Sequence, residues 1–346
     1  MGHWTIRPVQ EQDIPLIAAT ESAVGPEPWA EEQVREWEEF CRTDRDYPMR
    51  WFVAVGHDGA FAGWGNCGKA SWLASDEREI HVAVPPERRR QGVGGSLLEH
   101  AEALASKDRP KNLKAWCRGY DRDSFEWAVR RGYVLERQRT ESLLDLSSFD
   151  VSRFRKQLAD VESQGIEALT LWDHEVDPYL PGLYHVFVES FRDAPFRSKE
   201  AEDTPYESWM HETMGGKSRK LFVLARKDSE VIGSTNLYMP LAEGQSASVN
   251  YTGVLREHRG KGLGLALKAL AAAEGARAGA KQARTNNDPD NPAILRINEK
   301  LGFKPVPGPT ILKKDLRPDV TSCRGDDRVS PPPEAPPHPR QGSYCR

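Results

Sequence analysis

Runs of apolar residues and segments of helical periodicity alternate along most of the chain. In residues 96–105, for example, apolar side chains recur every three or four positions, as on one face of a helix. Strand-like runs bounded by turn residues predict strands at 4–7, 51–55, 60–64, 79–84, 114–117, 142–146, 220–225, 231–234 and 249–254. Helices are predicted at 96–105, 125–129, 150–164 and 265–276, with another that begins at Asp13. The pattern therefore predicts an α/β (α+β) fold.

The same pattern occurs twice, at an offset of 170 residues. The offset places Gly63 on Gly233 and Gly132 on Gly302, and no gap is needed between positions 52 and 133. A period of this length is far beyond the roughly 20–50 residues of solenoid repeats, and each copy is large enough to bury its own core. The repeat therefore indicates a duplicated domain.

The length of 346 residues suits two domains. We predict an N-terminal domain at 1–148, a connecting helix at 149–165 and a C-terminal domain at 166–316. Residues 317–346 are rich in proline and poor in apolar residues, so we expect this tail to be disordered.

Composition argues against several classes of function. The formal net charge is −4 and charges of both signs are dispersed, which disfavours nucleic-acid binding. The five cysteines form no Cys-x-x-Cys pair and the nine histidines are scattered, so no metal site is expected. No apolar run approaches the roughly 20 residues of a membrane span, and the N-terminus lacks a signal-peptide pattern. We expect a cytoplasmic protein with reduced thiols, monomeric or homodimeric.

The best-kept part of the repeat is a glycine loop. It has the sequence R-R-Q-G-V-G at 89–94 and R-G-K-G-L-G at 259–264, and each copy joins a predicted strand to a predicted helix. Glycine at alternate positions lets a phosphate approach the backbone N–H groups, and the helix N-terminus adds a partial positive charge. A pyrophosphate is the ligand that this arrangement predicts.

Other phosphate-binding loops fit the sequence less well. The chain has no G-x-x-x-x-G-K-S/T motif, and Leu97 and Leu267 occupy the third glycine position of a dinucleotide-binding fingerprint. One glycine loop before a helix is often only a tight turn. Two copies in the same strand–loop–helix context favour a ligand-binding role.

Both halves resemble the GNAT superfamily of N-acetyltransferases, whose pyrophosphate-binding signature is R/Q-x-x-G-x-G/A. The second half is the closer match, because its sequence N-P-A-I-L-R-I-N-E-K-L-G-F at 291–303 also resembles the family's N-x-x-A…L-G-F segment. The resemblance covers about residues 3–146 and 166–315. It implies two tandem domains, each a mixed, mostly antiparallel sheet flanked by helices. It also implies an acyltransferase whose donor is acetyl-CoA or another acyl-CoA.

The residues that match the family's CoA-binding positions are implied to bind CoA. In the first half these are Val82, Val84, Arg89, Gln91, Gly92, Val93, Gly94 and Gly95. In the second half they are Val254, Leu255, Arg259, Lys261, Gly262, Leu263, Gly264, Leu265 and Asn291. The thioester is implied to lie along the strand before the loop, where a backbone N–H near Val84 or Leu255 would stabilise an oxyanion.

The implied reaction is attack of an amine on the thioester. A lysine-like amine has a pKa near 10.4, so freeing its lone pair at pH 7 costs about 4.6 kcal/mol and calls for a general base. The candidate catalytic residues are Tyr251, Glu79 and His81, of which Glu79 and His81 share one face of a predicted strand and Tyr251 matches His81 at the offset. Asn298 in the second copy and Ala128 in the first stand where the family often has a general-acid tyrosine.

The two copies are not equal. Asp121 stands in the first copy where the second has Asn291, so we expect the C-terminal domain to be the catalyst. The many tryptophans of the first half are expected to form core, with an aromatic acceptor pocket as the alternative. Two other functions stay open, a non-catalytic acyl-CoA-binding regulator and a protein that binds another pyrophosphate. The acceptor is expected to be a small-molecule or peptide amine that the sequence does not identify.

Overall fold

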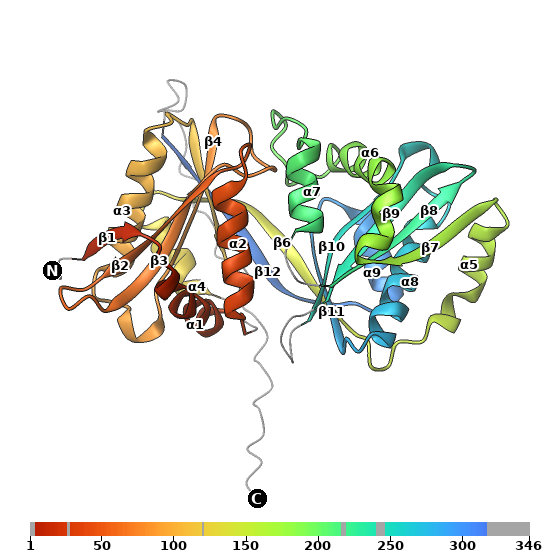
Figure 1. The fold of residues 1–346 in the computed structure, drawn as a ribbon, viewed down its shortest axis with the longest axis horizontal. Helices are drawn as coiled ribbons and strands as arrows, with labels where there is room; N and C mark the ends of the chain where they lie inside the picture. Colours follow the sequence, from red (N-terminus) through yellow and green to blue (C-terminus); the bar gives the residue numbers. More distant parts are fainter. Residues whose placement is uncertain (1–3, 26–27, 120, 216–218, 240–245, 317–346) are drawn as a thin grey trace, which may run out of the picture.

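The computed structural model describes residues 4–25, 28–119, 121–215, 219–239 and 246–316. Within these residues, the strands form one continuous sheet in the order β1-β2-β3-β4-β5-β12-β6-β11-β10-β9-β8-β7. Helices pack against the sheet in two lobes that lie side by side (Figure 1). The predicted mixture of helices with a mostly antiparallel sheet is confirmed.

The strands of the first half are β1 (Thr5–Pro8), β2 (Met49–Val55), β3 (Phe61–Gly68), β4 (Glu77–Ala83), β5 (Asn112–Cys117) and β6 (Val134–Asp145). Those of the second half are β7 (Ile166–Trp172), β8 (Lys220–Lys227), β9 (Glu230–Tyr238), β10 (Ala247–Val254), β11 (Gln282–Asn287) and β12 (Lys304–Asp315). The helices are α1 (Ile14–Val24), α2 (Glu31–Thr43), α3 (Val93–Ser106), α4 (Arg122–Val129), α5 (Arg155–Glu162), α6 (Leu180–Phe191), α7 (Tyr206–Met214), α8 (Leu263–Arg277) and α9 (Pro292–Leu301).

The strands inside each lobe are buried on both faces. The first six residues of β8 are all buried, and so are the last seven residues of β3. Helices cover both sides of such strands, so the sequence there is a run of apolar and small residues rather than an alternation. This explains why the runs at 51–55 and 220–225 were readable as strands.

Each half contains one parallel pair of strands, and a helix crosses over to connect its members. In the first half, α3 joins β4 to β5, which pair from Glu77 to Ile80. In the second half, α8 joins β10 to β11, and these pair only at Ala247 and Ser248. Beyond these short ladders the two strands have no pairing in common, which leaves a gap at the C-terminal end of β10.

The last strand of each half belongs to the sheet of the other half. β12 pairs with β5 of the first half, β6 pairs with β11 of the second half, and β6 and β12 pair with each other. Figure 1 shows both strands running between the lobes. Under the offset of 170, the pair Val134–Lys313 corresponds to the pair Leu143–Lys304, so the centre of the sheet has an approximate two-fold relation.

Four tryptophans of the first half, Trp29, Trp37, Trp51 and Trp64, pack together. Trp51 and Trp64 are buried and stack with ring centroids 4.6 Å apart, and Trp37 meets Trp51 edge-on at 4.7 Å. These rings join Ile14, Ile17 and Val34 in a core between α1, α2 and the sheet. The expected core role is confirmed for these tryptophans, whereas Trp72, Trp116 and Trp127 belong to other hydrophobic clusters.

The domain boundaries at 148 and 166 stay a prediction, because the exchanged strands make the sheet continuous across them. The segment between them contains a short 3₁₀ turn at Val151–Phe154 followed by α5. The predicted disordered tail, 317–346, lies outside the described residues.

Candidate active site

The two glycine loops have the same backbone design. In the second half, Gly260 and Gly262 have φ values of +75° and +83°, in the left-handed region that favours glycine, and α8 begins at the next residue. The Nε of Arg259 donates to the carbonyl of Val254 at 2.8 Å. In the first half, Arg89 donates likewise to Val84 at 3.2 Å. The arginine of the motif therefore fastens the loop to the end of the preceding strand.

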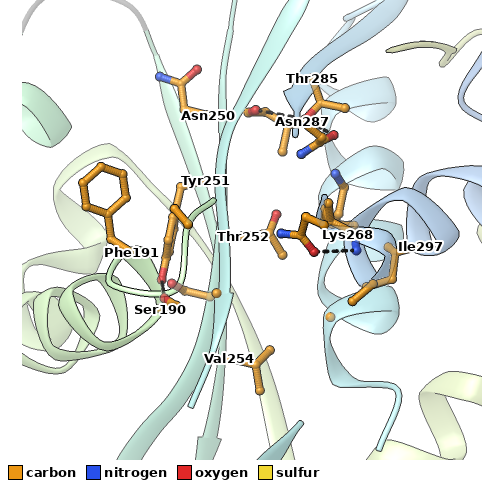
Figure 2. Close-up of a pocket in the computed structure, with 18 of the residues that line it drawn as sticks. Ser190, Phe191, Asn250, Tyr251, Thr252, Val254, Lys268, Thr285, Asn287 and Ile297 are labelled. Atoms are coloured by element: carbon orange, nitrogen blue, oxygen red, sulfur yellow. Dashed lines mark hydrogen bonds between the residues drawn. The ribbon is translucent and has the colours of Figure 1, made fainter. Parts of the chain in front are cut away.

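A cavity of about 900 Å³ lies beside the second loop. Its walls come from the loop, from β10 and β11, and from α6, α7, α8 and α9. Figure 2 shows Thr252 and Val254 of β10 on one side of this space, and Lys268 and Ile297 on the other. The cavity is also lined by Gln157, by residues of β8 and β9, and by three residues of the first half, Ser71, Trp72 and Arg139.

The gap between β10 and β11 opens into this cavity. Leu255 donates its N–H to Ile232 of β9 at 3.0 Å, so this group is already used within the sheet. Because hydrogen-bonding groups alternate along an antiparallel strand, the N–H of Val254 faces away from β9, toward the gap. The sequence places the expected oxyanion donor of this half near Leu255. The N–H that faces the gap belongs to the preceding residue, Val254, and not to Leu255 itself.

Tyr251 lies on the opposite face of β10 from Thr252. The strand has a register irregularity between Val249 and Tyr251, a bulge that turns the following side chains. The Tyr251 hydroxyl donates to the carbonyl of Val186 at 2.8 Å and also contacts the Ser190 hydroxyl. Burial raises the pKa of Tyr251, so the phenol stays protonated. Its catalytic role stays a prediction.

Glu212 is a titratable group of the cavity that the sequence did not indicate. It lies near the end of α7, lines the cavity and is exposed to solvent. Partial desolvation by the surrounding walls, with the nearby charge of Asp44, raises the pKa of the Glu212 carboxyl. The offset places Glu212 on Arg42, so the repeat carried no signal for it.

Lys268 is the second such group. It lies on α8 with only 3% of its surface exposed, and burial lowers its pKa to about 7. Among the described residues it forms no ion pair, and its ammonium group lies 5.1 Å from the centroid of the Phe303 ring. The offset places it on Leu98, which is buried in the first core. The sequence contains one signal for this residue, because the repeat aligns Lys268 with a leucine of the other copy.

Asn298 stands where the family often has a tyrosine, and it contacts Asn287, which lines the cavity. Asn298 donates its Nδ2 to Oδ1 of Asn287 at 2.6 Å, while its own buried Oδ1 has no partner among the described residues. Asn291, predicted to lie near the pantetheine arm, lines the cavity and accepts a hydrogen bond from the N–H of Ile294, which caps α9.

Glu79 and His81 lie on β4 of the first half and have partners there. Glu79 accepts a hydrogen bond from the indole of Trp72 at 2.8 Å, and burial raises its pKa. His81 lies 3.1 Å from the buried carboxylate of Glu21, which also binds Arg118 and the indole of Trp64. Burial would raise the pKa of Glu21, but His81 and Arg118 lower it below its usual value. The structure does not bring Glu79 and His81 together with Tyr251.

The wall beside the first loop differs from that beside the second. A Cβ built on Gly94 would lie 3.3 Å from Trp127, where the equivalent Cβ on Gly264 would lie 3.1 Å from Ile297. The guanidinium of Arg131 stacks 3.9 Å above the Trp127 ring. A large stacked indole therefore occupies the place that a smaller side chain has in the second half. Binding of CoA by Val82, Val84 and the loop residues 89–95 stays a prediction.

Within the described ranges, no cluster of three or more His, Cys, Asp or Glu side chains is placed to hold a metal ion. None of the helices seen there is both long and apolar enough to cross a membrane.

Comparison with known proteins gives one family. The model of the acetyltransferase (GNAT) family matches residues 15–133 and 180–303, one match in each half. Among characterised sequences, the chain is 28% identical over 263 residues to the mycothiol acetyltransferase of Geodermatophilus obscurus, covering 72% of this chain and 78% of that protein. It is 26% identical over 249 residues to the mycothiol acetyltransferase of Streptomyces griseus subsp. griseus, covering 71% and 74%.

Solved structures give the same arrangement of two halves. A tandem GNAT protein from the clavulanic acid biosynthesis pathway matches with a TM-score of 0.73 and 20% identity, over 92% of this chain and all of that one. A GCN5-related N-acetyltransferase from Sphaerobacter thermophilus matches with a TM-score of 0.63 and 18% identity, over 92% and 97%. At this identity the likeness concerns the fold.

Proposed function

The chain belongs to the acetyltransferase (GNAT) family as a tandem N-acetyltransferase, and we propose that its second half moves an acetyl group from acetyl-CoA to a primary amine. The observation that carries this proposal is the placement of the loop at 259–264 beside the cavity and the gap between β10 and β11. The loop would bind the pyrophosphate of CoA, and the gap would admit the pantetheine arm with its thioester.

The loop fits a pyrophosphate. A Cβ on Gly260 would meet nothing within 4 Å, so its surface is open, and the left-handed backbone at Gly260 and Gly262 turns successive N–H groups toward one side. The amide of Gln157 lies against Gly262, as the end of a flexible side chain that an incoming phosphate would displace. The N-terminus of α8 adds a favourable partial charge worth about 0.3–1 kcal/mol.

We assign the amine's proton to Glu212. A primary amine is mostly protonated near pH 7, and a carboxylate with a raised pKa accepts its proton at a lower cost than an ordinary carboxylate. The neutral amine would then attack the thioester carbon, while the N–H of Val254 stabilises the oxygen that becomes negative. Tyr251, on the same side of β10 as α6, would help to hold the acceptor through its fixed hydroxyl.

The leaving thiolate needs a proton or a positive charge. No tyrosine stands at position 298, but Lys268 lines the same cavity with a pKa near 7, where it exchanges a proton readily at neutral pH. We propose that Lys268 stabilises or protonates the CoA thiolate, and that Asn298 and Asn287 orient the groups around it.

Thermal shift tests the donor. Acetyl-CoA and CoA are expected to raise the melting temperature at concentrations where ATP and NAD do not. Equal stabilisation by ATP or NAD would favour the alternative hypothesis that the protein binds a different pyrophosphate. A screen of amines then tests for turnover by measuring the release of free CoA thiol. The same reaction without an amine serves as the blank. Stabilisation by acetyl-CoA without CoA release from any amine would favour the regulatory reading instead.

A further inference from the structure

We propose that the acceptor amine carries a second, anionic group, a carboxylate or a phosphate, and that Arg139 of the first half binds it. This inference rests on the proposed function of the same cavity. It assigns to the first half a share in acceptor selection, through a residue for which neither the glycine loops nor the repeat gave any signal.

Arg139 lies at the open end of β11. It is carried by β6, the exchanged strand, whose Thr140 pairs with Asn287, the last residue of β11. Arg139 therefore lies one position beyond that ladder, next to the residues Asn286 and Asp288 that also line the cavity. The exchange of strands is what brings a first-half side chain to this place.

The Arg139 guanidinium is held in place but its charge is not neutralised. It stacks 4.4 Å from the centroid of the Phe196 ring, and its Nη2 donates to the carbonyl of Asn286 at 3.0 Å. Its Nε is buried and has no acceptor among the described residues. Within those residues no carboxylate lies within 4.0 Å of it.

The acidic groups nearby already have other partners. Asp288 attracts Arg139, but both of its oxygens accept hydrogen bonds from Arg137 at 2.9 Å. Asp290 is bound by Arg137 as well, and Glu141 is bound by Arg284. Burial lowers the pKa of Arg139, yet a guanidinium remains charged at any physiological pH.

A partly buried cation without a counter-ion is costly, so a site that keeps one is suited to an anionic ligand. Carboxylate and phosphate match the fork of N–H donors on a guanidinium. One side of the wall around it is apolar, since Trp72, Phe191 and Phe196 pack together there and Phe196 contacts the Arg139 guanidinium. The connection between the amine and the anionic group is therefore expected to be a short hydrocarbon segment.

Matched pairs of amines test this. One series compares glycine, β-alanine, 4-aminobutyrate and 6-aminohexanoate with methylamine, ethylamine, propylamine and pentylamine, which lack the carboxylate. A second arm compares O-phosphoethanolamine with ethanolamine, and separates phosphate from carboxylate. In each case kcat/KM is measured by CoA release. The wild type is expected to prefer the anionic member of at least one pair by about 10- to 100-fold, the range for a hydrogen bond to a charged group.

Arg139→Met is expected to abolish that preference, and Arg139→Lys to retain part of it. The preference is the ratio of kcat/KM for two acceptors on the same variant. The fraction of folded protein cancels in this ratio, so partial folding does not change it. Arg35→Met makes the same chemical change on a partly exposed arginine of α2, outside the cavity lining, and should keep the wild-type ratio.

Two results would overturn the inference, namely a wild type that acetylates neutral and anionic amines equally, or an Arg139→Met variant that keeps the full preference. A different result, that acetyl-CoA does not raise the melting temperature of the wild type, would contradict the proposed function itself.

Discussion

Replacing Lys268 by methionine should make the protein more stable and less active. Methionine fills a similar volume without a charge, and the other copy of the domain has Leu98 at this position. Lys268 is almost fully buried and has no ion pair among the described residues, so its charged form is held at a cost. A lysine retained at such a cost is expected to serve the reaction.

The size of the effect follows from the pKa of Lys268, which burial lowers from 10.5 to about 7. Between these two values the unfolded chain binds a proton that the folded protein does not, so stability rises with pH across this window. Each pKa unit corresponds to 1.36 kcal/mol, so Lys268 makes the free energy of unfolding at pH 7 about 4 kcal/mol smaller than at pH 10.5. Relaxation around a charged Lys268 would reduce this, so a gain of about 2–4 kcal/mol is expected for Lys268→Met at pH 7.

The assay is unfolding by urea at pH 6.5, 7.5, 8.5 and 9.5, for the wild type and Lys268→Met in parallel. The difference in unfolding free energy between them should shrink as pH rises, by up to about 1.36 kcal/mol per pH unit. Other titrating groups are common to both proteins and cancel in the difference. Lys300→Met, on the exposed side of α9, serves as the control whose difference from the wild type should not depend on pH.

A stability difference that stays constant from pH 6.5 to 9.5 would refute the lowered pKa of Lys268. Turnover gives an independent check. If Lys268→Met is more stable and still releases CoA at the wild-type rate, then Lys268 has no role in the departure of the thiolate.

Three further predictions follow from the site. Gly262→Asp should abolish both turnover and stabilisation by acetyl-CoA. Gly262→Asn should have a smaller effect, because asparagine adopts the same left-handed backbone and carries no charge, and Gly92→Asp should leave turnover near the wild-type value. Equal losses of turnover in Gly262→Asp and Gly92→Asp would show that both copies are needed. Glu212→Gln should lower kcat about 10²- to 10⁴-fold and remove the decline of kcat/KM as pH falls through the raised pKa of Glu212, and an unchanged pH profile would exclude it as the base. Gly253→Ala should cost about 1–3 kcal/mol of unfolding free energy, because its Cβ would meet the hydroxyls of Tyr251 and Ser190; in a Tyr251→Ala background the cost should fall, and full additivity in urea unfolding would contradict the clash.

The elements and the repeat could be predicted from the sequence because they depend on neighbouring residues. Apolar runs gave the strands of each lobe, and the offset of 170 aligned the two loops without a gap. The exchange of β6 and β12 could not be predicted in this way. Each of these strands is compatible with the sheet of its own half, and the choice between the halves depends on contacts across the whole chain.

The cavity residues show the same limit. Asn291 and the loop at 259–264 were found because they belong to a recurrent local motif. Glu212 and Arg139 come from segments that no motif marks, and only the folded chain brings them to one cavity. Glu79 and His81 are expected at a site because they share a strand face, but both have structural partners in the first half. Trp72, seven residues earlier, donates to Glu79, and His81 contacts Glu21 from a distant segment.

The two loops also show why a motif shared by both copies does not establish that both copies bind the same ligand. In both halves the arginine of the motif donates to a carbonyl at the end of the preceding strand, that of Val84 or Val254, and this contact holds the loop through protein atoms alone. The loop sequence is therefore under a structural requirement in each copy. The walls are not under that requirement, and they differ, with Trp127 and its stacked Arg131 facing the first loop and Ile297 facing the second. Differences between the two copies in these walls, rather than the shared glycines, are what should decide which half binds acetyl-CoA productively.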